Sequence, residues 1–159
     1  MSEAVQTKKI NPYIIALVVL LPGFLSLAAS SATNVCQPNI AGYFGATQYE
    51  ANSVVTCYII AGGIMLPVTS YFSNLFGQKQ YLIYCIITFT LGCLFCILAT
   101  DLHLLILARL VQGIGSGSIL PICQAVLLET FPPEQRGVAM GLFGVAAMFS
   151  PLAGPYMGG

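Results

Sequence analysis

Five stretches of mostly apolar residues follow one another along the chain, and short polar connections separate them. They cover residues 12–36, 51–72, 81–99, 104–128 and 138–159. An α-helix needs about 20 mostly apolar residues to cross a bilayer, and each stretch has roughly that length. The connections hold the helix-breaking residues, in "QPNIAGYFGATQYE", "SNLFGQKQ", "TDLH" and "FPPEQRG". The pattern predicts an all-α membrane protein with five transmembrane helices.

The composition supports lipid as the solvent of this chain. Hydrophobic residues make up 57% of it and charged residues only 6%, whereas soluble domains carry about 25% charged residues. The net charge is zero, and no basic block is present that could neutralise the phosphates of a nucleic acid. We therefore expect membrane lipid as a partner and no nucleic acid.

The basic residues of the connections indicate the orientation of the chain. Residues 37–50 and 100–103 contain no lysine or arginine, and all four basic residues outside the apolar stretches fall on the other side: Lys8, Lys9, Lys79 and Arg136. Because basic residues concentrate in cytoplasmic loops, this predicts a cytoplasmic N-terminus. Residues 1–11 would then be a cytoplasmic tail and residues 12–159 the transmembrane unit.

The first apolar stretch has a second interpretation. Lys8 and Lys9 precede it, and "SLAASSA" follows its apolar part, which is the order found in a cleaved secretory signal peptide. Four further apolar stretches follow with no soluble region, and the first stretch is long enough to span. A transmembrane helix is the better interpretation.

Polar residues recur on one face of the first predicted helix. Ser26, Ser30, Thr33 and Gln37 lie three or four residues apart, and Asn34 lies one turn after Ser30. Such a stripe can form hydrogen bonds between close-packed helices. It can equally line a water-filled cavity. The sequence alone leaves both interpretations open.

The fourth predicted helix contains a charge. Arg109 is followed at four-residue steps by Gly113 and Gly117, and Gln112 lies three residues after it. Glycines at this spacing let a neighbouring helix approach closely, so we expect Gly113 and Gly117 to mediate helix packing. A charge near the bilayer centre costs about 3 kcal/mol and therefore usually faces the protein interior. The alternative is that Arg109 extends to the outer membrane surface.

The cysteines and the single histidine do not form a recognisable metal or catalytic site in the sequence. Nearly all six cysteines lie inside apolar stretches: Cys36, Cys57, Cys85, Cys93, Cys96 and Cys123. "CLFC" at 93–96 has the spacing of half a zinc site but lacks a second ligand pair. We interpret it as a helix-packing segment, and His103 as an interface residue. We expect no metal, no cofactor and no enzymatic activity.

Four segments together resemble a known family. They are "TNVCQPNI", "RLVQGIGSGSILP", "FPPEQRGVAMGLFG" and "SPLAGPYMGG". The second resembles the motif RxxQGxGxG, and the fourth resembles GPxxGG, the antiporter motif, with Gly154, Pro155, Gly158 and Gly159 at its defined positions. In this order they resemble the N-terminal part of a major facilitator superfamily transporter, most closely the fourteen-helix drug:proton antiporters of the EmrB/QacA type.

The resemblance implies roles for residues already singled out. It implies that Arg109 faces a central cavity and takes part in proton coupling, and we expect Gln112 to orient it. Ser30, Thr33 and Asn34 become candidates for lining a substrate cavity. The glycine and proline motif of the fifth helix would shape the packing against the other half of the transporter.

The connection between the second and third helices departs from the family pattern GxLaDrxGrk. Here it reads "SYFSNLFGQK", so Asn74 replaces the aspartate while Gly77 and Lys79 remain. Asn74 can form only neutral hydrogen bonds in place of the usual ion pairs. Glu129 could pair with Lys79, or it could be a solvated carboxylate. Ala29 replaces the aspartate of the family's first helix, and no carboxylate lies deep in an apolar stretch.

These observations predict a partial N-terminal half of a major facilitator superfamily fold in a bacterial cytoplasmic (inner) membrane. We expect an N-terminal fragment of a transporter roughly three times as long, because this fold needs two six-helix halves. The parent activity would be proton-coupled efflux of drug-like amphipathic compounds by alternating access, with a missing C-terminal half as partner. Export of a metabolite or siderophore is one alternative. A truncated, transport-incompetent membrane protein with a structural or regulatory role is another.

Overall fold

The computed structural model describes residues 12–158, so the predicted tail 1–11 and Gly159 lie outside the described residues. Within that range the chain forms five long α-helices and one short 3-10 helix: α1 (Pro12–Phe44), α2 (Gln48–Phe76), α3 (Gln78–Ile97), α4 (Leu102–Thr130), η1 (Pro133–Gln135) and α5 (Arg136–Gly158). All five α-helices are long and apolar enough to cross a membrane. The predicted all-α fold with five spanning helices is confirmed.

The helices are longer than the apolar stretches suggested. Helix α1 continues to Phe44, although the sequence predicted its end near residue 36 and although Pro38 lies inside it. A proline inside a membrane helix is tolerated, because neighbouring groups can satisfy the backbone groups that it frees. The predicted connection 37–50 therefore shrinks to residues 45–47.

Two glycines with positive φ make the tight turns possible. Gly45 (φ 61°) follows α1, and Thr47 then caps α2 with its hydroxyl accepting from the Glu50 amide while the Glu50 carboxylate accepts from the Thr47 amide. Gly77 (φ 83°) is the only residue between α2 and α3. Because L side chains rarely adopt such φ values, glycine suits both positions.

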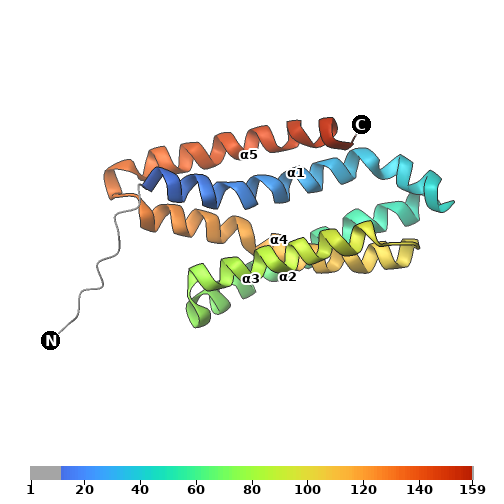
Figure 1. The fold of residues 1–159 in the computed structure, drawn as a ribbon, viewed down its shortest axis with the longest axis horizontal. Coiled ribbons are helices and arrows are strands. Elements are labelled where there is room, and N and C mark those ends of the chain that lie inside the picture. The colour runs from blue at the N-terminus through green and yellow to red at the C-terminus, as the bar shows by residue number, and fades with distance from the viewer. Residues whose placement is uncertain (1–11, 159) are drawn as a thin grey trace.

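Helix α4 is the centre of the bundle. It contacts each of the other four α-helices of the described chain. Half of the most apolar 18-residue segment of α4 is buried, against 28% or less of the corresponding segment in each of the other α-helices. Helices α2 and α3 pack against α4, and α1 pairs with α5, as Figure 1 shows. A group on α4 therefore faces the interior more often than a group on any of the other described α-helices.

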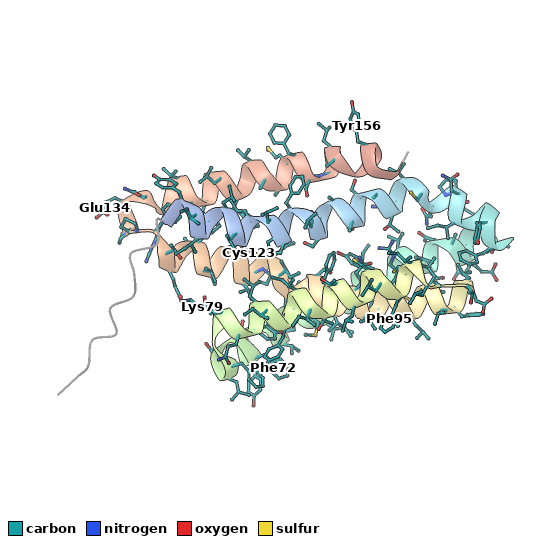
Figure 2. The ribbon with its side chains drawn as sticks, in the orientation of Figure 1. Phe72, Lys79, Phe95, Cys123, Glu134 and Tyr156 are labelled. Carbon is teal, nitrogen blue, oxygen red and sulfur yellow. The ribbon has the colours of Figure 1, made fainter. Side chains whose placement is uncertain are left out.

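Successive helices run in opposite directions, so α1, α3 and α5 begin at the same end of the bundle (Figure 1). Figure 2 shows Lys79 and Glu134 at this end and Tyr156 toward the opposite one. The described basic residues Lys79 and Arg136, at the starts of α3 and α5, thus lie at one end.

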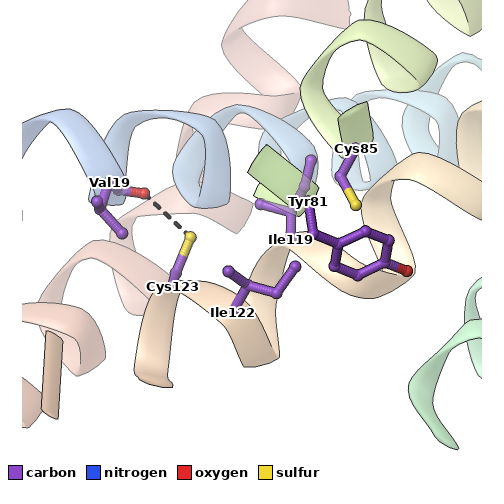
Figure 3. Packing of buried hydrophobic residues seen from close by; sticks show 6 residues of the cluster. All are labelled: Val19, Tyr81, Cys85, Ile119, Ile122 and Cys123. Atoms are coloured by element: carbon purple, nitrogen blue, oxygen red, sulfur yellow. Dashed lines mark hydrogen bonds between the residues drawn. The ribbon is translucent and has the colours of Figure 1, made fainter. Parts of the chain in front are cut away.

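The core joins α1, α3 and α4. Figure 3 shows a buried cluster of six residues: Val19, Tyr81, Cys85, Ile119, Ile122 and Cys123. The Cys123 thiol donates to the Val19 carbonyl at 3.0 Å. Nearby, the fully buried Ser118 hydroxyl lies 2.7 Å from the Thr69 hydroxyl and 3.0 Å from that of Tyr81. Because each buried hydroxyl has a partner, this network ties α2 and α3 to α4 without leaving a polar group unsatisfied.

Candidate functional site

The glycines of α4 bring three helices into backbone contact. A Cβ atom added at Gly113 would lie 2.6 Å from the Tyr58 carbonyl oxygen of α2, and one at Gly117 would lie 2.5 Å from the Gly62 Cα. A Cβ at Gly115 would lie 2.6 Å from the Phe89 amide nitrogen of α3. We call these three glycines of α4 the glycine seam. They fix α2 and α3 on two sides of one helix, with no room for side chains between the backbones.

One further glycine belongs to the same contact from the α3 side. A Cβ at Gly92 would lie 2.6 Å from the Cα of Gln112. The backbone of α3 therefore lies directly against α4 at the position of Gln112. This approach determines which α3 side chains the Gln112 amide meets.

Arg109 and Gln112 form a pair on α4. Arg109 is half-buried, Gln112 is only 3% exposed, and the guanidinium Nη1 donates a 2.8 Å hydrogen bond to the Gln112 Oε1. Residues three apart share a face of a helix, so the contact needs no distortion. The Nε of Arg109 is buried and has no hydrogen-bond partner in the described chain.

Two cysteines of α3 complete the surroundings of the Gln112 amide. Its Nε2 donates to the Cys93 Sγ at 3.0 Å, and the Cys96 thiol lies 4.0 Å from its Oε1. The amide thus has an acceptor on its nitrogen side and donors on its oxygen side. Its orientation toward Arg109 is determined by these partners.

A small recess brings Arg109 together with groups from α1 and α2. Its lining residues are Ser30, Thr33, Val55, Tyr58 and Arg109. An open hollow of about 210 Å³ lies beside it, and Ser30 and Tyr58 line both. The recess thus brings Ser30 and Thr33, which the sequence made candidates for lining a substrate cavity, together with Arg109.

Asn34 does not join this group. Its side chain is exposed and is not among the residues that line the recess. Each residue advances a helix by about 100°, so the residue after the buried Thr33 faces a different direction. The Thr33 hydroxyl itself donates to the Ala29 carbonyl at 2.8 Å, which satisfies it within α1.

The α2–α3 connection forms a separate feature at the end of the bundle where α3 begins. Asn74, Gly77 and Lys79 line an open hollow of about 590 Å³ together with Gln78 and Glu129. The partner of Glu129 is Gln78, whose Nε2 donates to the carboxylate at 2.6 Å. Lys79 and Asn74 are exposed. The neutral Gln78 amide thus lies next to Glu129, for which the sequence left open both a pair with Lys79 and a solvated carboxylate.

The antiporter motif lies in the last turns of α5. Gly154, Pro155 and Gly158 belong to the helix, while Gly159 lies outside the described residues. Just before the motif, the Ser150 hydroxyl donates to the Phe24 carbonyl, and the Ser31 hydroxyl donates to the Pro151 carbonyl at 3.0 Å. These bonds hold α5 against α1 at the start of the motif.

Sequence analysis missed several residues of this site. Tyr58, Cys93, Gly62 and Gly92 were not candidates, although Tyr58 lines both hollows and Cys93 contacts Gln112. These residues sit on α2 and α3, and their role depends on how those helices are positioned against α4. Only the small residues at Gly62 and Gly92 offered a signal, because glycine often marks a close helix contact.

The fold and this site together define an integral membrane helical bundle in which an arginine shares a recess with Ser30, Thr33 and Tyr58. The sequence profile of the Major Facilitator Superfamily matches residues 19–159. The chain belongs to this superfamily, and its five helices are part of the fold that the superfamily shares.

Curated relatives narrow the resemblance within the superfamily. The probable multidrug resistance protein EmrY of Escherichia coli is 33% identical over 91% of this chain and 28% of its own length. The uncharacterized MFS-type transporter YhcA of Bacillus subtilis is 32% identical over 94% of this chain and 28% of its own length. The lincomycin resistance protein LmrB of Bacillus subtilis is 32% identical over 99% of this chain and 33% of its own length. The chain thus spans about a third or less of the length of these relatives.

Proposed function

We propose that this chain supplies the first helices of a proton-coupled exporter of drug-like amphipathic compounds that works by alternating access. The single observation that carries the proposal is the Arg109–Gln112 pair beside a recess lined by Ser30, Thr33 and Tyr58. Polar and charged side chains inside a membrane are costly and usually mark an ion or substrate pathway. The names of EmrY and LmrB, both resistance proteins, favour drugs as the substrate class.

Each polar group of the site has a role in this proposal. Arg109 supplies a half-buried positive charge to the coupling machinery, and Gln112 holds the guanidinium toward the recess by its 2.8 Å hydrogen bond. Ser30 and Thr33 line the same recess as Arg109. Asn34, exposed in this bundle, would contact substrate only on the side where a second half packs.

The proton itself needs a group that changes its protonation state during the cycle. The carboxylates of the described residues all lie at helix ends: Glu50, Asp101, Glu129 and Glu134. We therefore place the proton-carrying group outside these helices, in a second half contributed by the rest of the transporter. Substrate sites of such transporters lie between repeats near the bilayer midplane, which assigns the same place to the bound drug.

The proposed location is the bacterial cytoplasmic membrane, with the N-terminus in the cytoplasm. The described basic residues Lys79 and Arg136 lie at the end of the bundle where α3 and α5 begin. Basic residues favour the cytoplasmic side. The turns at 45–47 and 98–101 would then face outward.

The test is efflux of ethidium from cells that express the complete protein to which these helices belong. We expect energy-dependent efflux that stops when a protonophore is added. Arg109→Ala should abolish it while the protein still inserts into the membrane, and Arg109→Lys should retain part of it. Arg136→Ala removes an exposed arginine at a helix end and is the matched control, with efflux unchanged.

Two outcomes would contradict the proposal in different ways. Wild-type efflux in Arg109→Ala would remove Arg109 from the mechanism. Absence of ethidium efflux, with release of a labelled metabolite or siderophore instead, would assign a different substrate class to the same fold. Intact mass after isolation from the native membrane addresses the remaining alternative, because a lone species of 16.9 kDa lacks the second half that alternating access requires.

A further inference from the structure

Arg109 lacks an anionic partner among the described residues. Its hydrogen-bond partner is the neutral Gln112 amide, and its Nε has none. Glu50, Asp101, Glu129 and Glu134 lie at helix ends. A charge inside a membrane protein is usually paired, because leaving it uncompensated costs free energy. Among residues 12–158, therefore, no carboxylate balances the positive charge of Arg109.

Two sulfur atoms of α3 contact the amide that accepts the guanidinium hydrogen bond. Cys93 and Cys96 are three residues apart and so share one face of the helix. Both reach the Gln112 amide, Cys93 at 3.0 Å from its nitrogen and Cys96 at 4.0 Å from its oxygen. The same amide oxygen accepts the hydrogen bond from the Arg109 guanidinium. Two half-buried thiols thus converge on the group that holds the buried cation.

The donor set restricts what such a pair could bind. In the described chain no group of three or more His, Cys, Asp or Glu side chains could hold a metal ion. Zinc, which takes four ligands in structural sites and three protein ligands in catalytic sites, is therefore a poor fit. Soft thiolate ligands select Cu(I), and Cu(I) is stable with only two sulfur ligands.

We propose that Cys93 and Cys96 form a two-coordinate Cu(I) site whose net negative charge is balanced by Arg109. Binding breaks both S–H bonds, forms two Cu–S bonds and releases two protons to solvent, with no change in oxidation state. The bis-thiolate complex carries one negative charge, equal and opposite to that of the guanidinium. The metal also removes the sulfur acceptor from the Gln112 amide, so binding would loosen the contact between α3 and α4 at Gly92.

The experiment is an anaerobic titration of the purified chain in detergent with Cu(I), in competition with the chromogenic Cu(I) chelator bicinchoninate. We expect one Cu(I) bound per chain. Cys93→Ser, Cys96→Ser and the double variant should each lose this binding. The double variant Cys36→Ser/Cys57→Ser removes the same number of half-buried thiols from α1 and α2 and should retain it. Circular dichroism and elution volume check that every variant is folded.

Arg109 provides a test that separates a charge-balanced site from two incidental thiols. Loss of a group that supports metal ligands typically lowers affinity about 10- to 100-fold, and we expect this for Arg109→Gln, with Arg109→Lys closer to the wild type. The proposal is overturned if the wild type binds no Cu(I), if the Cys93→Ser/Cys96→Ser variant binds as the wild type does, or if Arg109→Gln leaves the affinity unchanged. Binding is measured without transport, so failure of the proposed export function leaves the result intact.

Discussion

The guanidinium of Arg109 donates a 2.8 Å hydrogen bond to the Oε1 of Gln112, one turn further along α4. The other end of the same amide donates to the Cys93 sulfur of α3. A rotated amide would direct its NH₂ group at the guanidinium, and two donors would then face each other. The hydrogen bond from Gln112 to Cys93 of α3 thus fixes the orientation of the amide, and the amide in turn fixes the position of the Arg109 guanidinium.

This relationship predicts the effect of removing the Gln112 amide. Gln112→Leu leaves the half-buried guanidinium without its acceptor, and an unsatisfied buried group costs roughly 1–3 kcal/mol. We expect a lower midpoint temperature, measured as the fraction of monodisperse protein after heating, and efflux as weak as in Arg109→Ala. Gln112→Glu keeps an oxygen acceptor at the same place and is the control for stability. An unchanged midpoint in Gln112→Leu would contradict the importance of the hydrogen bond.

The glycine seam predicts that adding a single methyl group to one of its glycines lowers the stability of the bundle. Gly117→Ala places a Cβ 2.5 Å from the Gly62 Cα, which the backbones can accommodate only by moving apart. Overpacking of this kind typically costs about 1–3 kcal/mol, and the midpoint temperature of the same heating assay should fall. Gly63→Ala adds a methyl group to the neighbouring helix, where no atom of another helix lies within 4 Å. Equal midpoints for the two variants would show that α2 and α4 are not in backbone contact.

The charge distribution predicts which ends of the bundle are accessible from each side of the membrane. Lys79 and His103 are both exposed, and they lie near the starts of α3 and α4, at opposite ends. In intact cells a membrane-impermeant maleimide should label His103→Cys but not Lys79→Cys. After permeabilisation both should be labelled above the unsubstituted protein, which serves as the control for the native cysteines. The reverse pattern would invert the proposed orientation.

The number and type of helices followed from the sequence because a helix that crosses lipid needs about 20 mostly apolar residues. The positions of the helix ends were harder to predict, as Pro38 and Gly45 show. Proline commonly ends a helix in water, yet α1 passes through Pro38 and ends only at Phe44, before the positive φ of Gly45. The signal that mattered was the glycine, and the sequence alone gives no reason to prefer it over the proline.

The candidate site was predictable along α4 but not across helices. Arg109, Gln112, Gly113 and Gly117 lie on one element, so helical spacing was enough to group them. The contacts of Cys93 and Tyr58 depend on how α3 and α2 are rotated and shifted along α4. The spacing of residues within one helix carries no information about that placement. Thr33 and Asn34 show what spacing leaves open even within one helix, since Thr33 is buried in this bundle while Asn34 is exposed.

The glycine seam has a mechanical consequence for a protein of this family. Helices that touch through side chains can slide by repacking rotamers in small steps, as in shear motions. Helices that touch through bare backbone at Gly113, Gly115 and Gly117 have no rotamers to rearrange. In the proposed transport cycle, α2, α3 and α4 would therefore move as one rigid unit, and any flexing inside this bundle would fall between that unit and the α1–α5 pair.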